Sequence, residues 1–405
     1  MRHLVALLLA LTLGPAAQAG AAGMTTHAWM AEAAGEHVRD DRLQALMQRH
    51  RDELLSGAAY PDAGYAASSF PGGDFGEVSH WERFVNAHVA TLRRRCAPRP
   101  ADVCPAEVAH LLGAAAHGMG DELWDWLFEP AMHDHGESPE HPVAKQPGFA
   151  ELFRATPAGL INTSEYVMDV VAIRDHGRLL WGLTPPPADG LLETYAALGR
   201  RDVTRQGLLA GHAIVSLALA AERSSIAADY DRVRTTMPWS TEHMDDASGG
   251  VRPAARAIAG YLDSVWRKLH EDAHPRPVVV GVHPEPDEEG VPAVWQPAQT
   301  APGPRGGGAE RRILATLSNA IDPATVTPES FRLLDAQGDP VPLLDGWPKP
   351  GPYGAGDGTH TFMLYPAGDL APCSTYTAEV TPALRDHAGA KLARPHRWSF
   401  TTTGC

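Results

Sequence analysis

The hydrophobic pattern of the chain changes character near residue 272. Before this point apolar residues recur at spacings of three and four, the period of helices that bury one face. The clearest such segments are 42–55, 107–128, 203–223 and 253–269. After it, short runs rich in β-branched and aromatic residues alternate with turn-forming clusters. The pattern predicts an all-α helical bundle followed by an all-β sandwich.

The expected strands form a regular series in the last third of the chain. Their number, about seven, suits an immunoglobulin-like sandwich. Two stretches rich in proline and glycine, 297–308 and 346–358, are expected to be loops. The strand-like runs are 278–280, 313–317, 331–334, 361–365, 375–380 and 398–401.

The pattern from Leu364 through Tyr376 and Asp386 to Trp398-Ser399-Phe400-Thr401 resembles the bacterial Ig-like domains that accompany enzymes in secreted proteins. The resemblance implies the sandwich fold and says little about function. A spacer or stabilising role is favoured over a specific binding role.

The first residues have the features of a secretory signal peptide. Arg2 and His3 precede an apolar run, and small residues follow. Cleavage is expected after Ala19 or after Ala21, and the second choice leaves Ala22 as the new N-terminus. The expected organisation is a signal peptide (1–21), a helical domain (22–272) and an Ig-like domain (273–405), in a secreted or periplasmic protein.

Charge and cysteine content narrow the possible partners. The formal net charge of −15 argues against a stable nucleic-acid partner, because neutralising phosphates requires a basic face. Four cysteines in an exported chain predict two local disulfides, Cys96 with Cys104 and Cys373 with Cys405. Zinc ligation by these thiolates is the alternative, and the absence of a Cys-x-x-Cys spacing disfavours it.

The segment His117-Gly118-Met119-Gly120-Asp121 carries the sharpest chemical signal. A histidine and a carboxylate four residues apart lie on one face of a helix. The surrounding helix is apolar, so this face is expected to point inward. A buried carboxylate needs a partner, and a metal ion is an efficient one. The alternative is an exposed ion pair worth a few tenths of a kcal/mol.

Other segments repeat the theme of histidine and carboxylate in a fixed order. Together with residues 117–121, they resemble the zinc-dependent phospholipase C family, and within it the catalytic domains of glycosylphosphatidylinositol-specific phospholipases D. The resemblance covers residues 25–169 and continues more faintly to residue 269. The segments are Thr26-His27, Ser56 to Asp62, Glu77 to Ala87 and Met237-Pro238-Trp239-Ser240.

The resemblance implies an all-α bundle holding two to three zinc ions. The implied ligands of the first zinc are Asp62, His80, His117 and Asp121. Asp121 would bridge to a second zinc, held by His27 and by the free α-amino group of Ala22. The resemblance makes Asp62, His117 and Asp121 the catalytic residues, with Asp62 orienting or deprotonating the attacking water.

The third metal site departs from the family pattern. Asp125 and Glu165 stand where the family has histidines, and Asp169 completes the set. Three carboxylates form a harder site, which could favour Mn²⁺, Mg²⁺ or Ca²⁺. A second possibility is an imidazole from the segment that carries His133, His135 and His141, although a solvated polar turn is favoured there.

The implied activity is hydrolysis of a phospholipid head-group phosphodiester by a zinc-activated water. The substrate would be a phospholipid or a glycosylphosphatidylinositol, reached through transient contact with a membrane surface. The chain contains no Gly-x-Ser-x-Gly elbow, so no serine nucleophile is indicated. The alternatives are a single-strand nuclease or 3′-nucleotidase with a related metal site, and a non-catalytic surface protein that binds metal for stability.

Overall fold

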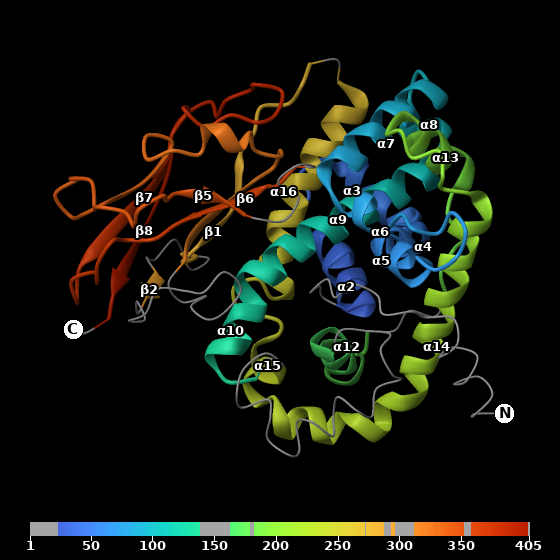
Figure 1. Cartoon of the computed structure of the whole chain (residues 1–405), viewed down its shortest axis with the longest axis horizontal. Helices are drawn as coiled ribbons and strands as arrows, with labels where there is room; N and C mark the ends of the chain where they lie inside the picture. The colour runs from blue at the N-terminus through green and yellow to red at the C-terminus, as the bar shows by residue number, and fades with distance from the viewer. Residues whose placement is uncertain are drawn as a thin grey trace.

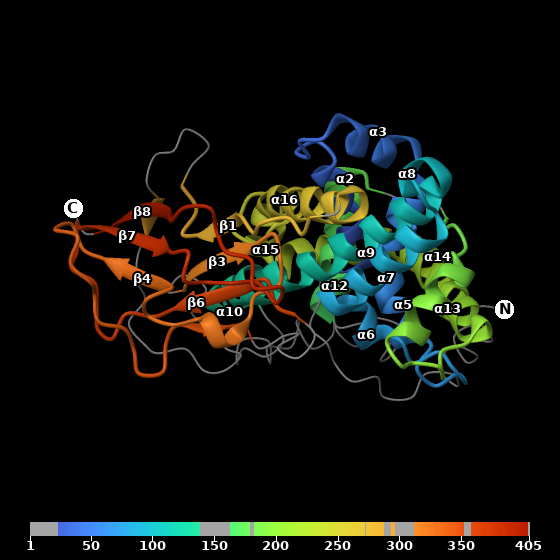
Figure 2. The same cartoon turned by 90° about the horizontal axis from the view of Figure 1, so that it is seen from above.

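The structure is a computed structural model that describes residues 23–137, 163–178, 182–271, 273–286, 293–295, 312–351 and 358–403. Helices occupy one end of the elongated molecule and strands the other, as two perpendicular views show (Figures 1 and 2). The chain is therefore a helical unit followed by a β-sandwich, which confirms the fold class predicted from the hydrophobic pattern.

The helical part is built around a long central helix, α9, which contacts α2, α4, α7 and α16. Its elements are α2 (Met24–Ala34), α3 (Asp41–Arg49), α4 (Arg51–Ala58), α5 (Tyr60–Ala66), α6 (Gly76–His80), α7 (Glu82–Arg95), α8 (Pro100–Val103), α9 (Pro105–Leu123), the π-helical turn η1 (Trp124–Phe128), α10 (Glu129–Asp134), α12 (Thr163–His176), α13 (Ala188–Ala197), α14 (Arg205–Thr236), α15 (Pro238–His243) and α16 (Val251–His270).

Two predicted helices differ from the observed ones at their ends. The expected helix 42–55 is divided at His50, whose backbone (φ −114°, ψ 41°) is not helical. Asp40 begins the first half as an N-cap, since its side chain accepts hydrogen bonds from Arg42 N and Leu43 N. The expected helix 107–128 is α-helical only to Leu123, after which η1 widens to a π turn.

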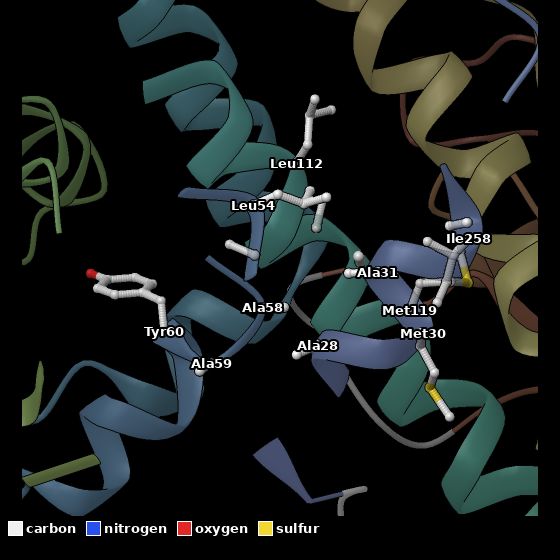
Figure 3. Packing of buried hydrophobic residues seen from close by; sticks show 14 of the residues in the cluster. Ala28, Met30, Ala31, Leu54, Ala58, Ala59, Tyr60, Leu112, Met119 and Ile258 are labelled. Atoms are coloured by element: carbon white, nitrogen blue, oxygen red, sulfur yellow. The ribbon is translucent and has the colours of Figure 1, made fainter. Parts of the chain in front are cut away.

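Close packing of small residues holds α4 against α9. A Cβ atom on Gly113 would overlap the carbonyl oxygen of Leu54, and one on Gly57 would overlap that of His110. Only glycine allows this approach of two helix backbones. On the other side of α9, Met119 packs with Met30 of α2 and Ile258 of α16 (Figure 3).

The disulfide Cys96–Cys104 joins the end of α7 to the start of α9, which confirms the first predicted pair. Cys373 is also disulfide-bonded. Its predicted partner, Cys405, lies outside the described residues.

The β-sandwich consists of two four-stranded sheets, with strand orders β1-β3-β6-β5 and β2-β8-β7-β4. Two short strands were not predicted: β2, and β5, which lies inside the expected loop 346–358. The two residues of β5 lack a strand-like sequence pattern, and they form a strand only because they pair with β6. The strands are β1 (Val279–His283), β2 (Ala293–Trp295), β3 (Ile313–Leu317), β4 (Phe331–Leu334), β5 (Lys349–Pro350), β6 (Thr361–Leu364), β7 (Thr375–Val380) and β8 (His396–Thr402).

The two parts share one hydrophobic core. Strand β1 lies on α16, where Gly260 leaves room for the side chain of Val280. Leu314 and Met363 of the first sheet belong to the same buried cluster as the helices. A second cluster, which includes Phe331 and Phe400, fills the space between the two sheets. Within the described residues, no helix is long and apolar enough to cross a membrane.

Candidate metal centre

The candidate centre is built on the last turns of α9. His117 and Asp121 lie one turn apart on the same face, and both side chains are buried. His117 Nε2 lies 3.3 Å from Asp121 Oδ2. The inward-facing pair predicted from the four-residue spacing is therefore present.

The two glycines between them admit neighbouring elements to this face. A Cβ atom on Gly118 would overlap the carbonyl oxygen of His80, and one on Gly120 would lie 3.1 Å from His27 Nδ1. The segment 117–121 thus supplies two candidate ligands and the space in which α6 and α2 bring two more. This second role of the glycines was not predicted from the sequence.

Four elements converge on the same point. Helix α2 contributes His27, α5 contributes Asp62, α6 contributes His80, and α9 contributes the remaining two side chains. Asp62 Oδ1 lies 3.6 Å from His80 Nε2 and 3.7 Å from His117 Nε2. Two sets of side chains each bring their potential ligand atoms within 4.8 Å of one another. One set is His27, His117 and Asp121, and the other is Asp62, His80 and His117.

The orientation of two imidazoles suits them to hold a cation. His80 Nδ1 lies 2.7 Å from the Gly76 carbonyl oxygen, and His117 Nδ1 lies 2.7 Å from that of Ala58. A carbonyl oxygen only accepts, so both Nδ1 atoms are donors, and in the neutral rings both Nε2 atoms are acceptors. These two Nε2 atoms face each other at 3.0 Å. Backbone carbonyls that fix the tautomer in this way are typical of metal-binding histidines.

Asp121 has the geometry of a bridging carboxylate. Its Oδ1 lies 3.0 Å from His27 Nε2, whereas its Oδ2 faces His117 and lies 3.5 Å from His80 Nε2. The other ring nitrogen of His27, Nδ1, is buried and forms no hydrogen bond with a described residue. Buried polar atoms without partners are rare unless a ligand completes them. The five side chains therefore fit zinc, which prefers imidazole and carboxylate ligands.

The electrostatics of the cluster favour positive charge at its centre. Burial alone would lower the pKa of His117, but the carboxylates of Asp121 and Asp62 raise it to about 9. Burial alone would raise the pKa of each carboxyl group, yet the facing histidines, His117 above all, hold both below their ordinary value. A divalent cation at this position would interact favourably with the same two carboxylates.

Asp169, predicted as a ligand of a third metal, binds the N-terminus of α2 in the structure. It accepts hydrogen bonds from Thr25 N at 3.0 Å, from Thr26 N at 2.8 Å and from Thr26 Oγ1 at 2.8 Å. A carboxylate at this position satisfies helix N–H groups that have no partner within the helix. The neighbouring turn approaches so closely that a Cβ atom on Gly23 would overlap the carboxylate.

Among the described residues, none of the other candidates for the third site belongs to the centre. Asp125 lies in η1, outside the two sets of potential ligand atoms. Glu165 lies in α12, but its side chain is not described, and neither is that of His133. His135 is exposed and stacks on Trp239 at 4.3 Å. The predicted third site stays a prediction.

Two further predicted positions fall outside the described residues. They are Ala22, whose α-amino group would complete the second site, and His141, an alternative ligand of the third. Thr26, which the resemblance pairs with His27, binds the Asp169 carboxylate.

Several groups that support the candidate centre were not predicted from the sequence. The carbonyls of Gly76 and Ala58 orient imidazoles, and backbone atoms leave no mark in a sequence. Tyr65 stands against the ring of His80, with 4.9 Å between ring centres, and its hydroxyl donates to Glu77 Oε2 at 2.6 Å. Burial and this carboxylate raise the pKa of Tyr65 well above its ordinary value.

Comparison with known proteins gives a family match and a distant curated relative. A sequence profile of the family described as "Bacterial Ig-like domain" matches residues 273–402. A phosphatidylinositol-glycan-specific phospholipase D from Bos taurus is 25% identical over 241 residues, which is 55% of this chain. The match covers 26% of that relative, so the chain spans about a quarter of its length.

Solved structures of a bacterial surface-layer protein also align with the chain. The N-terminal part of the S-layer protein SbsC matches with 13% identity and a TM-score of 0.21, covering 79% of this chain and 78% of that one. Domains 1–6 of the surface layer protein SbsC match with 13% identity and a TM-score of 0.20, covering 79% and 45%. TM-scores this low carry no argument about fold or function.

Proposed function

We propose that the chain is a zinc-dependent phosphodiester hydrolase that acts on phospholipid head groups. The observation that carries the proposal is the pair of Nε2 atoms of His80 and His117 that face each other at 3.0 Å between two carboxylates. Five side chains from four elements would hold two zinc ions, with Asp121 between them. When bound, zinc supplies a Lewis acid for a phosphoryl oxygen and lowers the pKa of a water molecule.

Asp62 is the residue of the five that can meet the attacking water. Its side chain is 19% exposed, whereas the other four are exposed by 4% or less. Burial alone would raise its pKa, but the facing histidines, His117 above all, hold it below the ordinary value, so Asp62 is ionised at neutral pH and can accept a hydrogen bond from the water. Asp62 therefore orients the water and takes its proton, while His27, His80 and His117 serve as ligands.

The lipid substrate is supported by the relative and by the first residues. The printed name of the bovine relative is that of a phospholipase D that acts on phosphatidylinositol-glycan. We extend this substrate class, phospholipids and glycosylphosphatidylinositols, to the present chain. The signal-peptide pattern at residues 1–21 fits an exported enzyme that meets its substrate during transient contact with a membrane surface.

Turnover by the purified chain tests the proposal. The metal-free protein is assayed with added zinc against phosphatidylinositol and phosphatidylcholine in mixed micelles, and against a 3′-nucleotide and single-stranded DNA. We expect cleavage of a phospholipid only. We expect His117→Ala to lower kcat/KM at least about 1000-fold, because His117 belongs to both sets of candidate ligands. His110→Asn, a buried histidine two turns earlier on α9, is the matched control and should retain activity.

The outcomes separate the three functions considered. Cleavage of the nucleotide or of DNA, without phospholipid cleavage, would replace the substrate class by that of a nuclease. Stoichiometric zinc without any turnover would leave a metal-stabilised surface protein. Phospholipid cleavage that persists unchanged in His117→Ala would contradict the proposed centre.

A further inference from the structure

Two buried carboxylates lie immediately beside the candidate ligands and play no part in the centre itself. Glu122 follows Asp121 on α9, and Glu82 lies two residues after His80 at the start of α7. Their exposed fractions are 2% and 5%. A buried carboxylate is stable only with partners, so the source of those partners matters.

Glu122 takes its partners from the Ig-like domain. Its Oε1 accepts from His360 N at 3.0 Å, and its Oε2 accepts from His360 N at 2.9 Å and from Thr361 N at 3.0 Å. The hydroxyl of Thr359 donates to Oε2 at 3.2 Å. In the described part of the chain, every hydrogen bond to this carboxylate comes from residues 359–361, at the start of β6.

Glu82 is tied to the same segment. Its carboxylate is bound by Lys268 and Tyr261 of α16, and His360 Nε2 lies 3.5 Å from its Oε2. The other ring nitrogen of His360 lies 2.9 Å from the Leu317 carbonyl oxygen, which fixes the imidazole against β3. His360 thus touches both carboxylates, one through its backbone and one through its side chain.

The position of Glu122 makes its partners important for the centre. An α-helix turns by about 100° per residue, so Glu122 and Asp121 project from adjacent faces of α9 and move together. The next residues leave the α-helical register at η1, and Arg312 of the Ig-like domain binds the Trp126 carbonyl there. The end of α9 is held from outside at two points. In two views, the end of α9 that continues toward α10 points to the strands (Figures 1 and 2).

We infer that the Ig-like domain is a positioning element of the metal centre, acting through the hydrogen bonds between residues 359–361 and Glu122. Without these donors, Glu122 would be a buried charge without partners, and α9 would have to shift to bring it to water. Such a shift displaces Asp121 from His27 and His80. The inference rests on the proposed zinc centre and replaces the predicted spacer role of the domain.

Zinc affinity of full-length variants tests the inference. The metal-free protein is titrated with zinc against a competing chelator. We expect Glu122→Ala to weaken zinc binding about 10- to 100-fold, the range seen when a group that supports a metal ligand is lost. Glu122→Gln should retain wild-type affinity, because the amide oxygen can accept from the same three donors.

A matched control separates positioning from general loss of stability. Glu379 is a buried carboxylate of the Ig-like domain that is bound by Arg332 and Arg397, away from the centre. Glu379→Ala should lower the melting temperature and leave zinc affinity unchanged. If Glu122→Ala does not fold, Thr359→Val removes one donor from the other side of the contact and should weaken zinc binding about threefold.

The results distinguish failure of the inference from failure of the proposed function. Wild-type zinc binding and turnover together with unchanged affinity in Glu122→Ala, or in Thr359→Val where that variant is used, would overturn the inference alone. Equal weakening by Glu379→Ala would also overturn it, since any destabilisation would then suffice. A wild-type chain that binds no zinc would overturn both.

Discussion

At the scale of single residues, the centre depends on atoms that carry no charge. His80 and His117 point their Nε2 atoms at each other because carbonyl oxygens of Gly76 and Ala58 hold the opposite nitrogens. Gly118 allows this arrangement, because its missing side chain leaves room for the backbone of His80. These backbone atoms and this glycine position the candidate ligands without being ligands themselves.

Replacing Gly118 tests this close approach. In Gly118→Ala the new methyl group would overlap the His80 carbonyl oxygen, so α6 must move away from α9. We expect zinc affinity to fall at least about tenfold, as for other losses of ligand support. Gly368→Ala, where a methyl group meets open space, is the control for both zinc affinity and stability. Wild-type zinc affinity in Gly118→Ala would show that the contact is not needed.

Asp169 offers a second test at this scale, because a helix cap and a metal ligand respond differently to replacement. As a cap of α2, Asp169→Ala should lower the free energy of unfolding by about 1–2 kcal/mol, measured by urea denaturation of the metal-free protein. Asp169→Asn keeps an acceptor and should lose less. If Asp169 is instead a ligand of a third metal, Asp169→Ala lowers the number of zinc ions bound per chain.

At the scale of elements, α7 and α9 bury histidines that are not ligands. His88 Nδ1 lies 2.7 Å from the Thr194 hydroxyl oxygen, and His110 packs edge-on against Tyr60. Burial lowers the pKa of each of these two histidines to about 3. Both are therefore held neutral in the folded state, and the two helices are sensitive to acid.

The direction of this acid effect follows from proton linkage. Between about pH 6.5 and pH 3 the unfolded chain binds protons at His88 and His110 that the folded chain does not. Stability is complete above the unfolded pKa and falls as the pH decreases through this window, by up to about 5 kcal/mol for each histidine. The free energy of unfolding, measured against pH on the metal-free protein, should show this slope.

The double variant His88→Asn, His110→Asn isolates these two histidines. It removes both titrating groups and should flatten the slope of unfolding free energy against pH in the same window, whatever its stability at pH 7. A slope equal to that of wild type would assign the acid sensitivity to other residues.

At the scale of the whole molecule, the helical part and the sandwich are joined by a common core and by buried polar contacts. Ser264 of α16 donates to Asn319, which in turn binds Asp386 in the sandwich. Residues 359–361 bind Glu122 on α9. Under the inference above, the proposed metal centre depends on a domain that contributes none of its ligands.

Metal removal tests the centre at this scale. A ligand bound only by the folded state stabilises it, by about 2.7 kcal/mol when its free concentration is 100 times its Kd. Treatment with a chelator should therefore lower the melting temperature, and added zinc should restore it. His27→Ala should show a smaller chelator effect, since it removes a ligand of one of the two ions. A melting temperature that does not respond to chelator would count against zinc binding.

Much of the fold and part of the centre could be predicted from the sequence, because their signals are local. The change from helical to strand-like periodicity near residue 272 can be read from residues a few positions apart. The two cysteines of the disulfide Cys96–Cys104 are likewise only eight residues apart. The spacing of His117 and Asp121 places them on one helix face wherever the helix lies. Strand β5 could not be predicted, since its backbone is ordered only by pairing with β6.

The sequence alone determined which side chains could bind a metal, and the tertiary structure decided which of them meet. Asp169 carries a carboxylate that could bind a metal, yet it binds the start of α2, 144 positions earlier in the chain. Glu122 has no distinguishing pattern, and its partner lies 238 positions further along the chain. Periodicity and spacing act over a few residues, whereas contacts across such separations depend on how complete elements pack.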